Sequence, residues 1–112
     1  MRVELVQLHW RRNDFAAAAE HAEKLLDVLP ESARPELKAF AYRALGQNAF
    51  VLGQMSEARN HFETAAELEP LNDFSHLQLG YCRWRQGNAQ QAIQHFARAA
   101  AIGGPSSREA RR

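Results

Sequence analysis

Three histidines recur along the 112-residue chain, 40 and 34 residues apart, as His21, His61 and His95. Histidine is the commonest metal ligand and a frequent general base, so this spacing is the first pattern to test for chemistry. If the three residues lie on successive helical units, they are separated by at least about 8–10 Å. A shared zinc ion needs its ligands at about 2 Å. The pattern therefore predicts a stripe of histidines on three helices and no metal site.

The other reactive side chains form no recognisable catalytic set either. Cys82 is the single cysteine, which excludes an internal disulfide, and it lies in a helical stretch where a packed thiol is expected. Asp14 and Glu20 are not placed as a carboxylate pair, and the segments at 53–58 and 87–92 lack the lysine of a phosphate-binding loop. We therefore expect no catalytic residues and no cofactor, that is, a protein that is not an enzyme.

The composition favours a small helical domain. Twenty of the 112 residues are alanine, the strongest helix former, and the chain is 46% hydrophobic and 24% charged. The net charge of +1 gives no sign of a nucleic-acid partner, and no apolar run is long enough to insert into a membrane. The N-terminus does not resemble a secretory signal. These features predict a soluble, cytoplasmic all-α protein, and twelve arginines against two lysines hint at a bacterial source.

An internal repeat organises the chain. Sliding residues 39–72 onto 73–106 matches nine identical residues, and sliding 1–30 onto 41–70 gives a weaker match. The nine pairs are Phe40/Phe74, Leu45/Leu79, Gly46/Gly80, Gly53/Gly87, Ala58/Ala92, His61/His95, Phe62/Phe96, Ala65/Ala99 and Ala66/Ala100. We therefore predict one domain over 1–105 with units at about 1–30, 39–72 and 73–106 and an extended loop at about 30–36. Residues 106–112 are either a basic tail or the start of a truncated capping helix.

Each unit is expected to hold two helices with a tight turn between them. Gly53, Gly87 and Asn13 stand at the turns, where a left-handed backbone is needed. Asp73 is expected to be an N-cap. The six expected helices are about Arg2–Arg12, Asp14–Leu29, Pro35–Leu52, Met55–Glu69, Asp73–Gln86 and Ala89–Ile102.

The repeat resembles the tetratricopeptide repeat, a 34-residue helix–turn–helix with the pattern W-x2-L-G-x2-Y…A-x3-F…P. The second unit has Tyr42, Leu45, Gly46, Ala49, Ala58, Phe62 and Pro70 at these places, and the third has His76, Leu79, Gly80, Arg83, Ala92 and Phe96. The resemblance implies a right-handed α-solenoid of three repeats and six helices. Glycine inside a helix predicts a close helix crossing, so leucine at Gly80 should be disruptive and alanine tolerated.

Members of this family bind extended peptides or partner helices in a concave groove lined by the first helix of each unit. The positions that the resemblance places in this groove are Gln7, Trp10, Arg11, Phe40, Arg43, Gln47, Phe50, Phe74, Leu77, Tyr81, Trp84 and Arg85. Trp10, Phe50 and Trp84 are equivalent under the two shifts. Such an aromatic ladder suits an apolar ligand, although the same residues could instead pack between helices.

Charge divides between the two kinds of helix. Leaving aside Asp73, the first helices carry seven basic and two acidic side chains, and the second helices carry three basic and eight acidic ones. A basic, aromatic groove would favour a ligand with acidic and apolar residues, unless the charges only solvate the helix faces. Only Arg43 and Gln47 approach the lysine–asparagine pairs with which some family members grip a chain-terminal carboxylate, so this type of binding is disfavoured.

The sequence thus predicts a protein–protein interaction module that serves as an adaptor, a scaffold or an assembly chaperone. Two alternatives stay open: a non-catalytic recruitment segment of a larger enzyme such as a transferase, and a self-associating repeat segment. Self-association would use an open apolar face on the last helix, formed by Ile93, Phe96, Ala97, Ala100 and Ala101. The two ends suggest either a segment cut from a longer repeat array or a natural protein with frayed ends.

Overall fold

The computed structural model describes residues 14–103, which form five α-helices and no strand. The helices are α2 (Phe15–Val28), α3 (Pro35–Val51), α4 (Met55–Leu68), α5 (Asp73–Arg85) and α6 (Ala89–Ile102). The prediction of an all-helical chain is confirmed for this part, and the five helices agree with the expected ranges to within one residue at each end. The expected helix at Arg2–Arg12 lies outside the described residues.

Side-chain caps fix where three of the helices begin. Asp14, Asn72 and Asn88 each accept a hydrogen bond from the backbone N–H three residues later, at 3.1–3.2 Å. The expectation that Asp73 caps α5 is wrong, because the amide oxygen of Asn72 takes the N–H of Ser75. Asp73 is instead the first helical residue, where its negative charge is still favourable beside the N-terminal end of the helix dipole.

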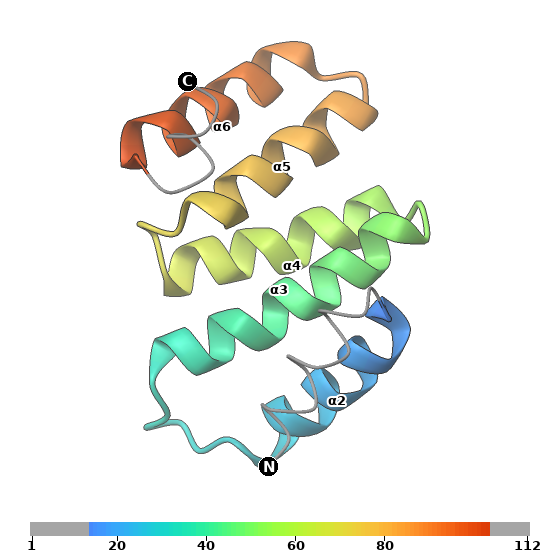
Figure 1. Ribbon diagram of the computed structural model, residues 1–112, viewed down its shortest axis with the longest axis vertical. Coiled ribbons are helices and arrows are strands. Elements are labelled where there is room, and N and C mark those ends of the chain that lie inside the picture. Colours follow the sequence, from blue (N-terminus) through green and yellow to red (C-terminus); the bar gives the residue numbers. More distant parts are fainter. Residues whose placement is uncertain (1–13, 104–112) are drawn as a thin grey trace.

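Two glycines reverse the chain between paired helices. Gly53 follows α3 with φ of 80°, and Gly87 follows α5 with φ of 82°. This left-handed conformation strains any residue with a Cβ, so glycine makes the shortest connection possible. Consequently α3 and α4 form one antiparallel hairpin, and α5 and α6 form a second (Figure 1).

The helices pack in chain order. The main contacts are α2 with α3, α3 with α4, α4 with α5, and α5 with α6, so α2 and α6 lie at opposite ends of the stack (Figure 1). Alanines make the α2–α3 contact close: Ala18, Ala22, Ala41 and Ala44 are at most 1% exposed. Small side chains let two helix backbones approach, which explains much of the alanine content.

No helix among residues 14–103 has the length and hydrophobicity that crossing a membrane requires.

A phenylalanine packs over a helical glycine in each hairpin. Phe62 of α4 lies against Gly46 of α3 and is fully buried, and Phe96 of α6 lies against Gly80 of α5. A Cβ built at Gly80 would stand 2.5 Å from the Cε1 atom of Phe96, closer than any carbon contact permits. The predicted close crossing is therefore present. Alanine at Gly80 requires the Phe96 ring to move, so the expectation that alanine is tolerated stays a prediction that depends on this movement.

Candidate protein-binding surface

Two aromatic side chains of α5 are open to solvent. Trp84 is 61% exposed and Tyr81 is 43% exposed. With half-buried Leu77 they follow the i, i+4, i+7 spacing that places residues on one helix face. The Tyr81 ring stands edge-on against Phe96, with centroids 5.3 Å apart, so α6 holds it in place. A large exposed aromatic pair on a rigid helix is the type of surface that contributes strongly to protein binding.

Contacts at the turn ends of the two hairpins link the end of α5 to α3 and α4. The guanidinium carbon of Arg85 lies 5.5 Å from the centroid of the half-buried Phe50 ring, a cation–π contact. The Gln86 side chain donates a hydrogen bond to the Ser56 hydroxyl at 3.4 Å. The structure thus brings Phe50, Trp84 and Arg85 to neighbouring ends of α3 and α5. We call Phe50, Leu77, Tyr81, Trp84 and Arg85 the aromatic surface.

Arg43 has an internal partner. Its Nη1 donates to the Glu69 carboxylate at 2.7 Å, and the two side chains are only 12% and 29% exposed. Arg83 similarly lies 3.7 Å from Glu63. Arg85, by contrast, is exposed, and its guanidinium lies over the face of a neutral ring. It is therefore the cation of the aromatic surface best placed to meet an acidic ligand.

The remaining predicted groove residues lie in or near the helix packing. Phe40 packs against the buried cluster between α2 and α3, and Phe74 packs edge-on against Phe62 with centroids 6.4 Å apart. Gln47 is half-buried, and its Oε1 is buried without a hydrogen-bond partner among the described residues. Gln7, Trp10 and Arg11 lie outside the described residues.

Two of the three repeated histidines, His61 and His95, stack on neighbouring rings. His61 stacks on Tyr42 at 6.2 Å, and His95 stacks on His76 at 6.3 Å. Burial lowers the pKa of both His61 and His95, and Glu57 and Glu23 near His61 only partly oppose this. Repulsion from His76 and Arg83 adds to the lowering of the pKa of His95. Within residues 14–103, no three side chains of the metal-binding types gather.

The side chain of His76 has a structural role that the sequence did not predict. Its Nε2–H donates to the Pro70 carbonyl oxygen at 3.0 Å, which ties α5 to the connection that precedes it. The residue is 7% exposed. The only signal in the sequence was its place at the tryptophan position of the repeat pattern, where a packed ring is expected.

The thiol of Cys82 is buried. Burial raises its pKa to about 11, although Arg59, Arg83 and Arg85 act in the opposite direction. A thiol with this pKa is protonated near neutral pH and is a weak nucleophile. This agrees with the predicted packing role.

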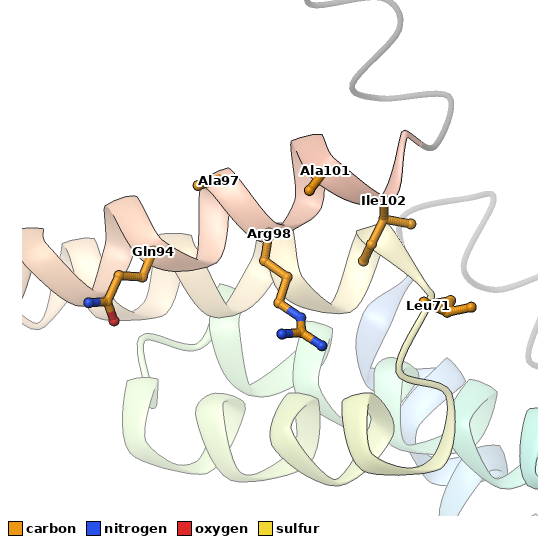
Figure 2. A pocket seen from close by; sticks show the side chains of 6 residues that line it. All are labelled: Leu71, Gln94, Ala97, Arg98, Ala101 and Ile102. Atoms are coloured by element: carbon orange, nitrogen blue, oxygen red, sulfur yellow. The ribbon is translucent and has the colours of Figure 1, made fainter.

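The outer side of α6 carries a second exposed apolar region. Ile93 is 63% exposed, and Leu71, in the connection between α4 and α5, is 79% exposed. A shallow groove of about 510 Å³ lies between α6 and Leu71 (Figure 2). Its lining residues are Leu71, Gln94, Ala97, Arg98, Ala101 and Ile102. The exposure of Leu71 was not predicted, since its place in a connection fixes neither burial nor exposure.

Comparison with known proteins agrees with the helical hairpins. A sequence profile described as "Tetratricopeptide repeat" matches residues 43–107, more than half of the chain. The matched segment includes all of α4, α5 and α6 and both glycine turns. A comparison with curated proteins gives no significant match.

Proposed function

Because the chain belongs to the tetratricopeptide repeat family, whose repeats mediate protein–protein interactions, we propose that it binds a peptide or partner helix as an adaptor, scaffold or assembly chaperone. The proposal includes a right-handed solenoid of six helices, with units at about 1–30, 39–72 and 73–106. In that arrangement α3 and α5 line one concave face. The aromatic surface then lines this groove along α5 and at the end of α3.

The exposure of Trp84 is the observation that carries the proposal. A tryptophan that only stabilised the fold would be expected to lie largely inside, and this one is 61% exposed beside Tyr81. Covering such a side chain with a ligand removes a large apolar area from water and orders few rotatable bonds. The free energy gained in this way is available for binding.

The ligand that fits this surface combines apolar and acidic groups. An apolar side chain would cover Trp84 and Tyr81, and a carboxylate would approach Arg85. Arg43 contributes little to this attraction, since Glu69 already neutralises its charge. The acidic preference predicted from the sequence therefore depends mainly on Arg85.

Selection from random peptides tests the proposal whatever the natural partner is. A display library of random 12-residue peptides is selected on the full chain, and the enriched peptides are titrated against variants. Trp84→Ala should weaken binding at least about 30-fold, the equivalent of about 2 kcal/mol. Val28→Ala, at a 63% exposed position of α2, is the matched control and should bind normally. Equal binding by both variants would contradict the proposal.

Two other roles and the cytoplasmic location remain predictions from the sequence. A recruitment segment of a larger enzyme would use the same aromatic surface, so the selection experiment applies to it unchanged. Self-association through α6 predicts a dimer that dissociates on dilution, which sedimentation velocity over a concentration series would detect. A particle of constant monomeric mass would contradict it.

A further inference from the structure

One ring pair joins the two helices of each hairpin, and its chemistry differs between the hairpins. Tyr42 of α3 stacks on His61 of α4 with the ring centroids 6.2 Å apart, and His76 of α5 stacks on His95 of α6 with the centroids 6.3 Å apart. The 34-residue shift places Tyr42 on His76 and His61 on His95. The α5–α6 contact therefore contains two basic rings, which we call the histidine pair, where the α3–α4 contact contains one.

The hydrogen bonding of His76 fits the neutral ring. Its Nε2–H donates to the Pro70 carbonyl oxygen at 3.0 Å, which leaves Nδ1 as the unprotonated nitrogen. This Nδ1 is buried without a hydrogen-bond partner within residues 14–103, and so is the Oδ2 atom of Asp73, one turn earlier on α5. A proton added to Nδ1 would meet no acceptor in this arrangement, and burying an unpaired N–H is costly.

Most of the charged groups around the half-buried His95 are positive. Burial lowers the pKa of His95, and repulsion from His76 and Arg83 of α5 and from Arg98 of α6 lowers it further. Arg98 lies one turn beyond His95 on the same helix. A proton on His95 is therefore opposed from both helices that the histidine pair joins.

The carboxylate that acts on His95 from α4 belongs to Glu63, and two arginines already share it. Its Oε1 lies 3.2 Å from the Nε atom of Arg59 and 3.7 Å from the Nη2 atom of Arg83. Glu63 favours the protonated form of His95, but less than the other groups disfavour it, since the pKa of His95 is lowered on balance. This carboxylate therefore does not neutralise the second hairpin in acid.

The equivalent histidine of the first hairpin has different neighbours. Burial lowers the pKa of His61, but the charges that act on it are the carboxylates of Glu57 and Glu23, which oppose this lowering. The ring that stacks on it, Tyr42, has no basic nitrogen. Acid should therefore weaken the α5–α6 contact more than the α3–α4 contact.

We propose that the histidine pair is a pH-sensitive contact that lets α6 separate from α5 in mild acid while α3 and α4 stay together. α6 is the last helix of the described stack and packs mainly on α5, so this separation leaves the α4–α5 contact in place (Figure 1). Phe96, the residue after His95, supports Tyr81. Separation of α6 therefore also removes a support of the aromatic surface, a consequence that rests on the proposed function.

Amide hydrogen exchange of the full chain, followed by mass spectrometry, distinguishes the two hairpins. Exchange is converted to protection factors at pH 7.5 and 5.5, which removes the effect of pH on the chemical exchange rate. The open hairpin takes up protons more readily than the closed one, so stability is full above the ordinary pKa of 6.5 and falls below it. Protection of α6 should fall about threefold or more, and protection of α4 less than about twofold.

Substitutions of Arg98 test the electrostatic origin without disturbing the packing, because this residue is exposed. Arg98→Gln should reduce the loss of α6 protection at pH 5.5, and Arg98→Glu should reduce it further, since a carboxylate favours the protonated His95. His95→Gln should remove most of the loss. His61→Gln is the matched control in the first hairpin and should leave the response of α6 unchanged.

The link to the aromatic surface is tested with peptides that are selected on it at pH 7.5. Their affinity should fall severalfold more between pH 7.5 and 5.5 for the unmodified chain than for Arg98→Glu, a comparison that cancels titration of the peptide itself. An equal fall for both chains would remove this link. Failure to select any peptide would count against the proposed function, while the exchange experiment would still decide on the histidine pair.

Three results would overturn the pH-sensitive contact. The first is α6 protection that does not change between pH 7.5 and 5.5. The second is an equal loss of protection in α4 and α6, which would mean that acid acts on the whole stack. The third is the same loss in the unmodified, Arg98→Glu and His95→Gln chains, which would place the titrating group elsewhere.

Discussion

Replacing Gly80 by alanine tests the close crossing of α5 and α6. The new Cβ would lie 2.5 Å from Cε1 and 2.7 Å from Cδ1 of Phe96. Since carbon atoms prefer separations of about 3.5 Å or more, the ring must retreat by about 1 Å. Phe96 is half-buried, so it can move outward, but this movement disturbs its edge-on contact with Tyr81.

Two opposing terms set the size of the effect. Alanine gains about 1 kcal/mol over glycine inside a helix. Overpacking costs about 1–3 kcal/mol, so the net change for Gly80→Ala is a destabilisation of about 1 kcal/mol. The larger side chain of Gly80→Leu should lower the free energy of unfolding by several kcal/mol. Urea unfolding followed by circular dichroism measures both values.

A double-mutant cycle with Phe96→Ala isolates the clash. Without the ring, Gly80→Ala loses its steric cost and keeps its gain in helix propensity, so it should stabilise the variant by about 1 kcal/mol. The two substitutions should then be coupled by about 2 kcal/mol. An equal effect of Gly80→Ala with and without the phenylalanine would refute the inferred crossing.

Three further experiments test the buried histidines, the Cys82 thiol and the ion pair between Arg43 and Glu69. Burial lowers the pKa of His61 and His95 below the ordinary 6.5. As the pH falls, these histidines therefore take up protons in the unfolded chain before they do so in the folded chain. The free energy of unfolding should be highest above pH 6.5 and should fall as the pH drops below it. A urea midpoint that does not change between pH 7.5 and 5.5 would contradict this. Cys82, with its pKa raised to about 11, should resist iodoacetamide at pH 8 and react only when urea unfolds the chain. Rapid labelling of the folded protein would show that the thiol is accessible. Arg43→Ala should lower the free energy of unfolding by about 1 kcal/mol through loss of the 2.7 Å pair with Glu69, and an unchanged midpoint would mean that the pair contributes nothing.

The helices could be predicted from the sequence because their limits depend on local chemistry. Gly53 and Gly87 recur at the 34-residue period, and each adopts the positive φ that a tight turn requires. The cap of α5 was harder to predict, because Asn72 and Asp73 are both good capping residues and adjacent. Only the position of the Ser75 N–H decides between them.

The candidate site could be predicted only in part, because exposure depends on contacts between distant segments. Phe74 and Trp84 were both assigned to the groove from their place in the repeat, yet one packs on Phe62 and the other is 61% exposed. Likewise, the partner of Arg43 is 26 residues away along the chain. No local pattern distinguishes such a paired arginine from a free one.

The most direct test of the central claim compares thermal unfolding of Trp84→Ala and Phe62→Ala. Phe62 is fully buried and Trp84 is 61% exposed, so the pair contrasts a packing aromatic with a binding one. Phe62→Ala should cost about 3–5 kcal/mol and lower the melting temperature by many degrees. Trp84→Ala should melt within about 2 °C of the unmodified chain, since a binding residue contributes little to the fold. If the two variants melt equally early, Trp84 belongs to the fold and the aromatic surface is not the binding surface.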